Sequence, residues 1–240
     1  MMYPRVILLL MLTFALPQAH AKEEGRNVDP LESINRPLFA LNDGLDRFLV
    51  RPLAIGYDFI LPEFAKRGMG NFFANMYDAN AAVNSVLQGR FMGAAQSSGR
   101  FLVNSTFGLL GFVDVATSMG IRPYRTDFGH TLAIWGVPEG PYVMVPLFGP
   151  RTFRSGTGTI FDSYVSVQAN IDTVRVRNTL WGLELIDGRS RFLRVDDLIS
   201  GDRYIFVRDA YLQQREIFVN DGVVTDTFSD FDDEEWDDEF

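Results

Sequence analysis

The stretch that decides the fold lies in the middle of the chain, at residues 91–113, and its sequence is FMGAAQSSGRFLVNSTFGLLGFV. It contains a single charged residue, Arg100, among apolar and small residues. A helix that is apolar nearly all round is buried, either in a protein core or in lipid. Small residues four positions apart permit close helix packing. Gly108 and Gly111 argue against one unbroken span, so the sequence leaves both kinds of burial open.

The segments before this stretch predict a series of amphipathic helices. Apolar residues there recur every three or four positions, with polar residues between them, which is the pattern of a helix with one apolar face. The predicted helices cover residues 29–48, 53–61, 63–76 and 78–89.

Capping residues set the ends of these helices. Asp29 is the expected N-cap of the first helix, with Glu32 completing a capping box. Pro37 lacks an amide donor and is expected to kink that helix. Asp78 is the expected N-cap of the fourth helix, and Gly89 is expected to end it. These signals divide the region before residue 91 into separate helices.

The segments after the central stretch differ from one another. Residues 126–150 are rich in glycine and proline, which predicts a loop region with short extended pieces. Helical patterns return at about 171–200. A final helix is expected at 202–220, with Gly222 after its end. The chain is therefore expected to be mainly α-helical.

The first 21 residues have the parts of a secretory signal peptide. Arg5 precedes an apolar run, Val6–Leu16, and Ala19-His20-Ala21 places small residues at the positions that a signal peptidase recognises. The run is too short to cross a membrane, which takes roughly 20 apolar residues. We therefore expect cleavage after Ala21, and residues 22–28 form a linker to the domain.

The charge of the chain is concentrated at its other end. Of the 31 acidic residues, nine lie in residues 225–240, and the other 22 balance the 22 basic residues. A neutral body with an acidic tail predicts no nucleic-acid partner, because phosphate contacts need a basic face. A block of like charge is typical of disorder, so residues 223–240 are expected to form a disordered tail.

The sequence contains no pattern that demands an enzyme. It has no cysteine, and His130 is the only histidine outside the predicted signal. No G-x-S-x-G motif presents a nucleophilic serine, and no glycine-rich nucleotide-binding fingerprint is complete. Metal sites built on histidine or cysteine are excluded by number. We therefore predict no catalytic residues, no metal and no cofactor.

Several motifs, in order along the chain, carry a family resemblance. They are Asp29–Phe39 (DPLESINRPLF), Arg51–Ala54 (RPLA), Asn71–Asn75 (NFFAN), Val83–Gly89 (VNSVLQG), Arg100–Thr106 (RFLVNST), Gly108–Ala116 (GLLGFVDVA), Asp127–Leu132 (DFGHTL), Gly140–Pro150 (GPYVMVPLFGP) and Arg203–Arg215 (RYIFVRDAYLQQR). Together they resemble the VacJ/MlaA family of Gram-negative outer-membrane proteins, from about Asp29 to Gly222.

The resemblance implies a fold, a location and a function. Residues 29–222 would form a compact, ring-shaped helical domain embedded in the periplasmic face of the outer membrane, with a channel through the ring. The protein would remove mislocalised phospholipid from the outer leaflet and hydrolyse nothing. It would pass the lipid to a soluble periplasmic carrier that feeds an inner-membrane ABC transporter. It would also associate with a trimeric porin.

The chain departs from the family pattern at two points. Members usually carry a lipidated cysteine after the signal, and this chain has none. The arginine after the Gly-Pro block is often followed by aspartate, whereas Arg154 precedes Ser155 here. The missing cysteine leaves the mode of membrane attachment open. Two other functions also stay open, a periplasmic lipid or cell-wall hydrolase that uses His130 or a carboxylate pair, and a porin-associated structural protein.

The candidate site residues follow from the amphipathic faces. They are expected to contact the membrane or line a lipid path, and they are Leu38, Phe39, Leu41, Leu45, Phe72, Phe73, Phe107, Leu109, Leu110 and Phe112.

The signal peptide gives the first testable prediction. The exported protein should begin at Lys22, because the peptidase recognises Ala19 and Ala21. Intact-mass spectrometry of protein purified from the cell envelope measures this directly. A mass that still contains residues 1–21 would contradict export by a cleaved signal.

Overall fold

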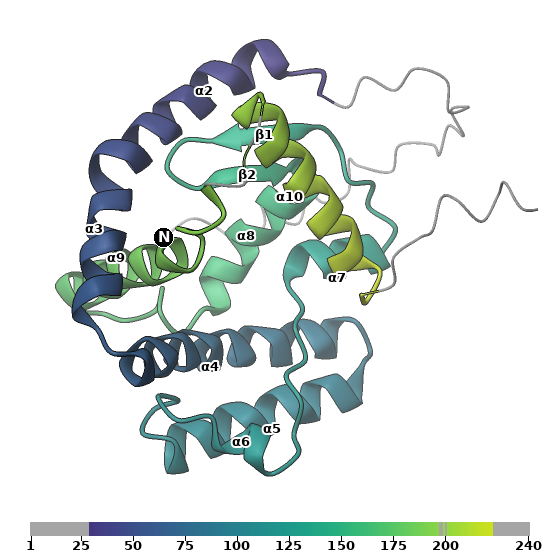
Figure 1. The fold of residues 1–240 in the computed structure, drawn as a ribbon. Coiled ribbons are helices and arrows are strands. Elements are labelled where there is room, and N and C mark those ends of the chain that lie inside the picture. Colours follow the sequence, from purple (N-terminus) through teal and green to yellow (C-terminus); the bar gives the residue numbers. More distant parts are fainter. Residues whose placement is uncertain (1–28, 197–198, 200, 223–240) are drawn as a thin grey trace, which may run out of the picture.

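The computed structural model describes residues 29–196, 199 and 201–222, and the fold over these residues is mainly α-helical (Figure 1). Its elements, in chain order, are α2 (Glu32–Leu45), the π-helix η1 (Asp46–Val50), α3 (Arg51–Ile60), α4 (Glu63–Leu87), α5 (Phe91–Phe107), α6 (Val115–Ser118), α7 (Phe128–Ile134), β1 (Tyr142–Val145), β2 (Gly149–Thr152), α8 (Phe153–Val165), α9 (Val174–Arg191) and α10 (Arg203–Val219). The predicted signal peptide, its cleavage site, the linker and the acidic tail lie outside the described residues.

The helices are arranged around a short β-hairpin and a long central helix (Figure 1). The segment from α2 through η1 to α3 forms one curved arm, and α9 packs against α3. Helix α4 crosses below, and α5 packs along it on the side away from the hairpin. Helices α8 and α10 lie on the other side, against β2, and α7 packs on α8.

The start of α2 differs from the predicted capping box. The helix begins at Glu32 with Leu31 as its N-cap. The Asp29 carboxylate accepts hydrogen bonds from the Leu31 amide at 3.1 Å and from the Asn35 amide group at 2.9 Å. It also accepts the hydroxyl of Tyr204 in α10. Asp29 therefore joins two distant helices instead of capping one.

Helix α2 is joined to the hairpin by a buried amide. The Asn35 side chain donates to the Tyr142 carbonyl at 3.0 Å and accepts from the Met144 amide at 2.8 Å, both in β1. The helix passes through Pro37 without interruption, and the irregular winding falls later, in η1.

Helix α4 is one continuous helix where the sequence predicted two. The predicted boundary between residues 76 and 78 is wrong, because α4 runs from Glu63 to Leu87. Asp78 lies inside it and is buried, and its carboxylate accepts from Arg100 Nε at 3.1 Å. The predicted end is confirmed, since Gly89 follows with a φ of +71°. A tertiary partner thus explains an aspartate that resembled a helix cap.

Helix α5 buries its one charge and exposes part of its apolar surface. The Arg100 guanidinium also donates to Asp114 Oδ2 at 3.0 Å and to the Ile121 carbonyl at 2.7 Å. Leu102 and Phe107 are exposed. The central stretch is therefore packed on one side only. Over the residues that the structure describes, no helix has the length and apolar character needed to cross a membrane.

The Arg100 contacts fix geometry more than they add stability. Burial raises the pKa of the Asp78 carboxyl to about 6, although the Arg100 charge opposes this shift. Because the folded-state pKa of Asp78 is raised, its ionisation lowers the free energy of unfolding as the pH rises from about 4 through 6. Buried ion pairs often contribute little net stability, but breaking one leaves an uncompensated charge.

The region predicted as a loop, 126–150, contains a helix and a hairpin. The prediction of short extended pieces is confirmed by β1 and β2, which pair antiparallel with Tyr142 opposite Thr152. The short helix α7 was not predicted, because the density of glycine and proline excluded only a long helix. Asp127 caps it by accepting the His130 amide at 2.7 Å. Helix α7 is stabilised by its N-cap and by packing on α8. The density of glycine and proline in the sequence gives no information on these two contacts.

The remaining helices agree with the sequence patterns in part. Helix α9 lies within the predicted range 171–200, and α10 matches the prediction for 202–220, with Asp202 as its N-cap. Helix α8 was not predicted. It begins with a capping box formed by Thr152 and Ser155, where serine takes the place of the usual glutamate or glutamine.

Replacement of Arg100 tests the role of this buried charge. Arg100→Met should lower the free energy of unfolding by about 3–5 kcal/mol, because Asp78 and Asp114 then lose their shared partner. Arg47→Met removes an exposed pair with Asp43 and should cost at most about 1 kcal/mol. Chemical denaturation of both variants measures the difference. Equal losses would contradict this account.

Candidate functional site

A polar cavity of about 320 Å³ lies between α4, the start of α7, β2, α8 and α10. Nearly every residue that lines it has a polar side-chain atom, and Phe218 is the exception. The polar residues are Tyr77, Asn80, Thr126, Asp127, Arg151, Ser155, Thr159, Asp162, Tyr211, Gln214 and Arg215. Small-molecule pockets are usually lined mainly by apolar side chains. This cavity differs in carrying a polar side-chain atom on nearly every lining residue, so it can contact an ionic group.

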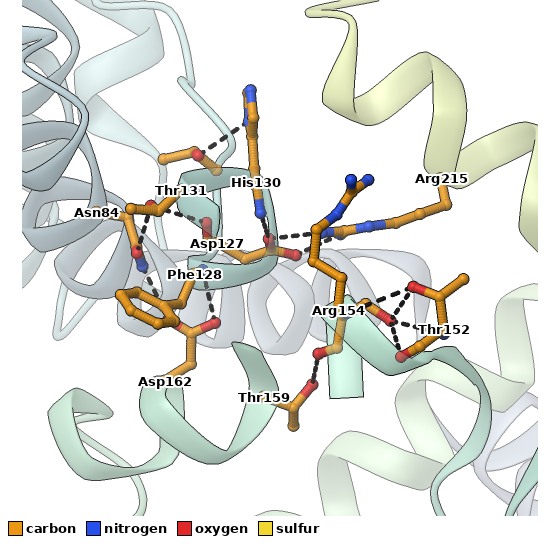
Figure 2. A network of polar contacts seen from close by, with 12 residues as sticks. Asn84, Asp127, Phe128, His130, Thr131, Thr152, Arg154, Thr159, Asp162 and Arg215 are labelled. Carbon is orange, nitrogen blue, oxygen red and sulfur yellow. Dashed lines mark hydrogen bonds and ion pairs between the residues drawn. The ribbon is translucent and has the colours of Figure 1, made fainter. Parts of the chain in front are cut away.

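An ion pair forms one wall of the cavity. Arg215 of α10 donates to both carboxylate oxygens of Asp127, at 2.5 Å and 2.9 Å (Figure 2). Burial alone would raise the pKa of the Asp127 carboxyl, but the hydrogen bonds and charge of Arg215 bring it below its usual range. Asp127 also caps α7 through the His130 amide. One carboxylate thus sets both the start of α7 and its position against α10.

A second carboxylate fixes α8 to α7 and α4. Asp162 Oδ2 accepts the Phe128 amide at 3.0 Å, and Oδ1 accepts the Asn84 side-chain amide at 2.8 Å (Figure 2). Asn84 in turn accepts the Thr131 hydroxyl at 2.9 Å. Burial raises the pKa of Asp162 above its usual range. All these polar atoms satisfy one another, so this part of the network is structural.

Glycines allow α7 and α8 to approach closely at this network. A Cβ added to Gly158 would lie 2.4 Å from the Gly129 nitrogen, and one added to Gly129 would lie 2.5 Å from Arg215 Nη2. Any larger residue at either position would separate the two helices or displace the Arg215 side chain. Close packing of α7 and α8 therefore needs glycine at both positions, and Gly129 is one of the glycines that suggested a loop.

The cavity holds one arginine whose charge is not matched by an ion pair. Arg151 of β2 donates to the Pro150 carbonyl at 2.8 Å, and no carboxylate of the described residues lies within 4.0 Å of it. The lining also carries hydroxyl groups, and Ser155 Oγ lies 2.7 Å from Tyr211 Oη. A cation beside hydroxyl groups can bind an anionic oxygen by charge-assisted hydrogen bonds.

His130 lies beside the cavity, in α7 and not in the predicted loop. Its side chain is buried, and burial lowers its pKa. Nδ1 lies 3.2 Å from Thr126 Oγ1, and Nε2 lies 3.9 Å from Asp221 Oδ1. The order Thr126, His130, Asp221 resembles that of a nucleophile, a base and an acid. The distance from His130 Nε2 to Asp221, however, exceeds that of a hydrogen bond.

The neighbours of His130 are engaged elsewhere. Thr126 Oγ1 accepts the Gln88 side-chain amide at 2.7 Å, and Asp221 pairs with Arg90 at 2.7 Å. A triad needs its base bonded to both partners. The arrangement around His130 thus lacks the contact that would orient a catalytic base.

The predicted site residues separate into two groups, and none of them lines the cavity. One group packs within the protein. Leu38 and Phe39 pack against a buried cluster of Tyr142, Met144 and Tyr204. The other packed residues are Phe73, which is buried, Phe72, which contacts it edge to face, and Phe112, whose ring covers Gly68.

The second group is exposed. Leu41, Phe107, Leu109 and Leu110 are between 52% and 75% exposed, and Leu45 is half-buried. Leu109 and Leu110 both have positive φ angles, of 52° and 59°, which places them in a turn after α5. A bulky residue rarely adopts this conformation, so the turn presents both leucines outward at a cost in strain.

Other large apolar residues, outside the predicted set, are also exposed. Phe48 and Phe59, on η1 and α3, are 88% and 89% exposed, and Phe91 and Met92 on α5 are more than 70% exposed. Soluble proteins rarely expose many large apolar side chains together, and such surfaces mark protein or membrane contacts.

Comparison with known proteins follows this geometry. The family model described as MlaA lipoprotein matches residues 27–217. A relative from Escherichia coli K12, named intermembrane phospholipid transport system lipoprotein MlaA, is 36% identical over 206 residues, which are 83% of this chain and 81% of the relative. The relative of the same name from Haemophilus influenzae is 28% identical over 86% of this chain and 85% of its own length.

A solved structure agrees with the sequence comparison. It is described as the structural basis for maintenance of bacterial outer membrane lipid asymmetry, and its chain is 34% identical to this one. The TM-score is 0.70, and the match covers 80% of this chain and 98% of that chain. The fold is thus shared over nearly the whole of the solved chain.

The Asp127–Arg215 pair predicts a pH dependence of stability. Because its folded-state pKa is lowered, Asp127 contributes stability above its unfolded pKa of about 4 and loses this contribution as the pH falls through the folded value. Asp127→Asn should therefore cost about 1–2 kcal/mol at pH 7, since the carboxylate is partly exposed, and progressively less below pH 4. Denaturation curves across pH measure the difference.

A neutral substitution on the same cavity wall is the control. Gln214→Ala changes no ionisable group, so its effect on the unfolding free energy should not vary with pH. A constant Asp127→Asn difference between pH 7 and pH 3 would contradict the assigned ion pair.

Proposed function

The chain belongs to the MlaA family, and on that premise we propose that it moves phospholipid at the bacterial outer membrane and so maintains lipid asymmetry. The names of its relatives support this function, and so does the shared fold. The single observation that carries the proposal beyond the family is the polar cavity with the unmatched charge of Arg151. The direction we propose is removal of phospholipid from the outer leaflet.

The cavity would accept the headgroup of the lipid. Moving a phosphate out of water is costly unless charged and polar groups replace its hydration. Arg151, the hydroxyl group of Tyr211 and the side-chain amide of Gln214 can do this. The volume of about 320 Å³ is at the lower end of the range for small-molecule sites.

The acyl chains would stay on the exposed apolar surface. Phe107, Leu109 and Leu110 lie outside the cavity and are available for this contact. We propose that the helices lie in one leaflet without spanning the bilayer. The sequence contains no cysteine, so an acyl anchor on a thiol is not available. Apolar side chains must then supply the membrane contact, at the periplasmic face of the outer membrane.

Further elements of the proposal come from the family resemblance. We propose that the helices enclose a channel in a ring-shaped domain, that a trimeric porin holds the protein in the membrane, and that a soluble periplasmic carrier receives the lipid for an inner-membrane ABC transporter.

We also propose that transport is non-enzymatic. The support is the separation of His130 Nε2 from Asp221 Oδ1, which at 3.9 Å exceeds a hydrogen bond. The competing function is lipid hydrolysis at His130. It predicts the opposite result for a His130 variant, so one complementation experiment distinguishes the two.

Complementation of a strain that lacks this protein tests the proposed function. Loss of the protein should raise phospholipid in the outer leaflet, measured by labelling intact cells. Arg151→Glu should fail to restore asymmetry, because it replaces the free cation of the cavity by an anion that repels phosphate. Arg122→Glu, in an exposed loop outside the cavity, carries the same charge change and should restore it.

His130→Gln decides between transport and hydrolysis. This variant should restore asymmetry, because transport uses no base. Its abundance in the outer membrane must first equal that of the wild type, since His130 is buried. A normally abundant His130→Gln protein that does not restore asymmetry would support the hydrolase and overturn non-enzymatic transport.

A further inference from the structure

A second hollow lies apart from the polar cavity and has a different charge. This groove, of about 490 Å³, lies between the start of α4, the end of α9 and the segment before α7, and it shares no lining residue with the cavity. Its charged residues are two acids, Asp58 and Glu63, and five cations, Lys66, Arg67, Arg125, Arg191 and Arg194. The groove therefore has an excess of positive charge.

One lysine takes up both carboxylates of the groove. Lys66 Nζ lies 2.7 Å from Asp58 Oδ1 and 2.7 Å from Glu63 Oε1. Arg125 and Arg194 have no carboxylate within 4.0 Å among the described residues. Two guanidinium groups therefore face the groove with their charge unmatched.

The other wall of the groove holds an arginine in a fixed position. Arg191 Nη2 donates to Asp187 Oδ2 at 2.6 Å, and the buried Asp187 also accepts the Tyr57 hydroxyl at 2.9 Å. The guanidinium lies against α4 at Gly70, where an added Cβ would lie 2.0 Å from Nη2. Contacts from α3, α4 and α9 thus place this cation at the groove.

Large apolar side chains lie next to the groove in the chain. Phe59, Ile60 and Phe64, at the corner between α3 and α4, are 89%, 74% and 66% exposed. Asp58 precedes the first two of them in the sequence, and Phe64 lies between Glu63 and the basic pair Lys66-Arg67. Exposed aromatic residues beside cations are typical of a membrane interface, where the apolar groups enter the acyl region and the cations meet the phosphates. A site for a free anion would need no such apolar neighbours.

We propose that this groove binds the phosphate of a membrane phospholipid headgroup and holds the α3–α4 corner against the bilayer surface. Arg125, Arg191 and Arg194 contact the phosphate, while Phe59 and Phe64 enter the acyl layer. The excess of cations gives a preference for anionic phospholipid. The groove lies outside the transport cavity and makes a contact at the membrane surface. The assignment of this groove rests on the proposed function only in the choice of a membrane lipid.

Vesicle binding of the purified, exported protein tests the groove. The probes are vesicles of phosphatidylcholine alone and vesicles that also contain phosphatidylglycerol. Arg125→Gln/Arg194→Gln should lower partitioning onto the anionic vesicles by about 25-fold, since each cation near a surface contributes roughly fivefold. Neither residue forms an ion pair among the described residues, so the variant should fold. Circular dichroism checks this.

Matched variants separate the groove from net charge. Arg122→Gln/Arg175→Gln removes the same charge from exposed positions outside the groove and should change partitioning much less. Phe59→Ser/Phe64→Ser should weaken binding to both kinds of vesicle. Equal partitioning of the two arginine pairs would overturn the proposal.

Inorganic phosphate distinguishes the two sources of the anion. Phosphate titration should show much weaker binding to the groove than anionic vesicles, because the free ion gains nothing from Phe59 and Phe64. Tight phosphate binding that survives Phe59→Ser/Phe64→Ser, without vesicle binding, would assign a free-anion site and overturn the lipid assignment. Vesicle binding does not depend on transport, so a failure of lipid asymmetry in cells would overturn the proposed function alone.

Discussion

The buried guanidinium of Arg100 imposes a constraint on which the rest of this structure depends. A charge taken out of water has to be paired, and Asp78 and Asp114 pair it from α4 and from the start of α6. The relative positions of three helices are thereby set by one side chain. The Asp127–Arg215 pair does the same for α7 and α10. Polar contacts, which are directional, orient these helices more strictly than apolar packing would.

This arrangement explains how the protein can serve both lipid and water. Charged and amide side chains occupy much of the interior, while large apolar residues such as Phe48 and Phe59 stay outside. An interior of this kind can include a polar cavity for an ionic headgroup. We propose that the exposed apolar residues contact lipid. The two halves of a phospholipid would then have separate surfaces to contact.

Local signals predicted the fold better than the site. The helix at 202–220 and the end at Gly89 follow from capping residues, whose partners are near in sequence. Asp78 resembled a cap because its partner, Arg100, is 22 residues away. The candidate lipid residues include both core and surface residues. The reason is that an amphipathic helix face has the same sequence pattern whether it packs in the core or contacts lipid. Arg151 and Arg215 come together only through the fold, although Arg215 lies in a recognised motif and Arg151 directly follows another.

The central claim is that the folded protein holds a phospholipid by its headgroup. The most direct measurement is mass spectrometry of lipid that co-purifies with the exported protein, after extraction in mild detergent. The account predicts diacyl phospholipid in near-stoichiometric amount with the wild type, and much less when the Arg151 charge is reversed. Lipid that is absent from the wild type, or equal in amount in both proteins, would contradict it.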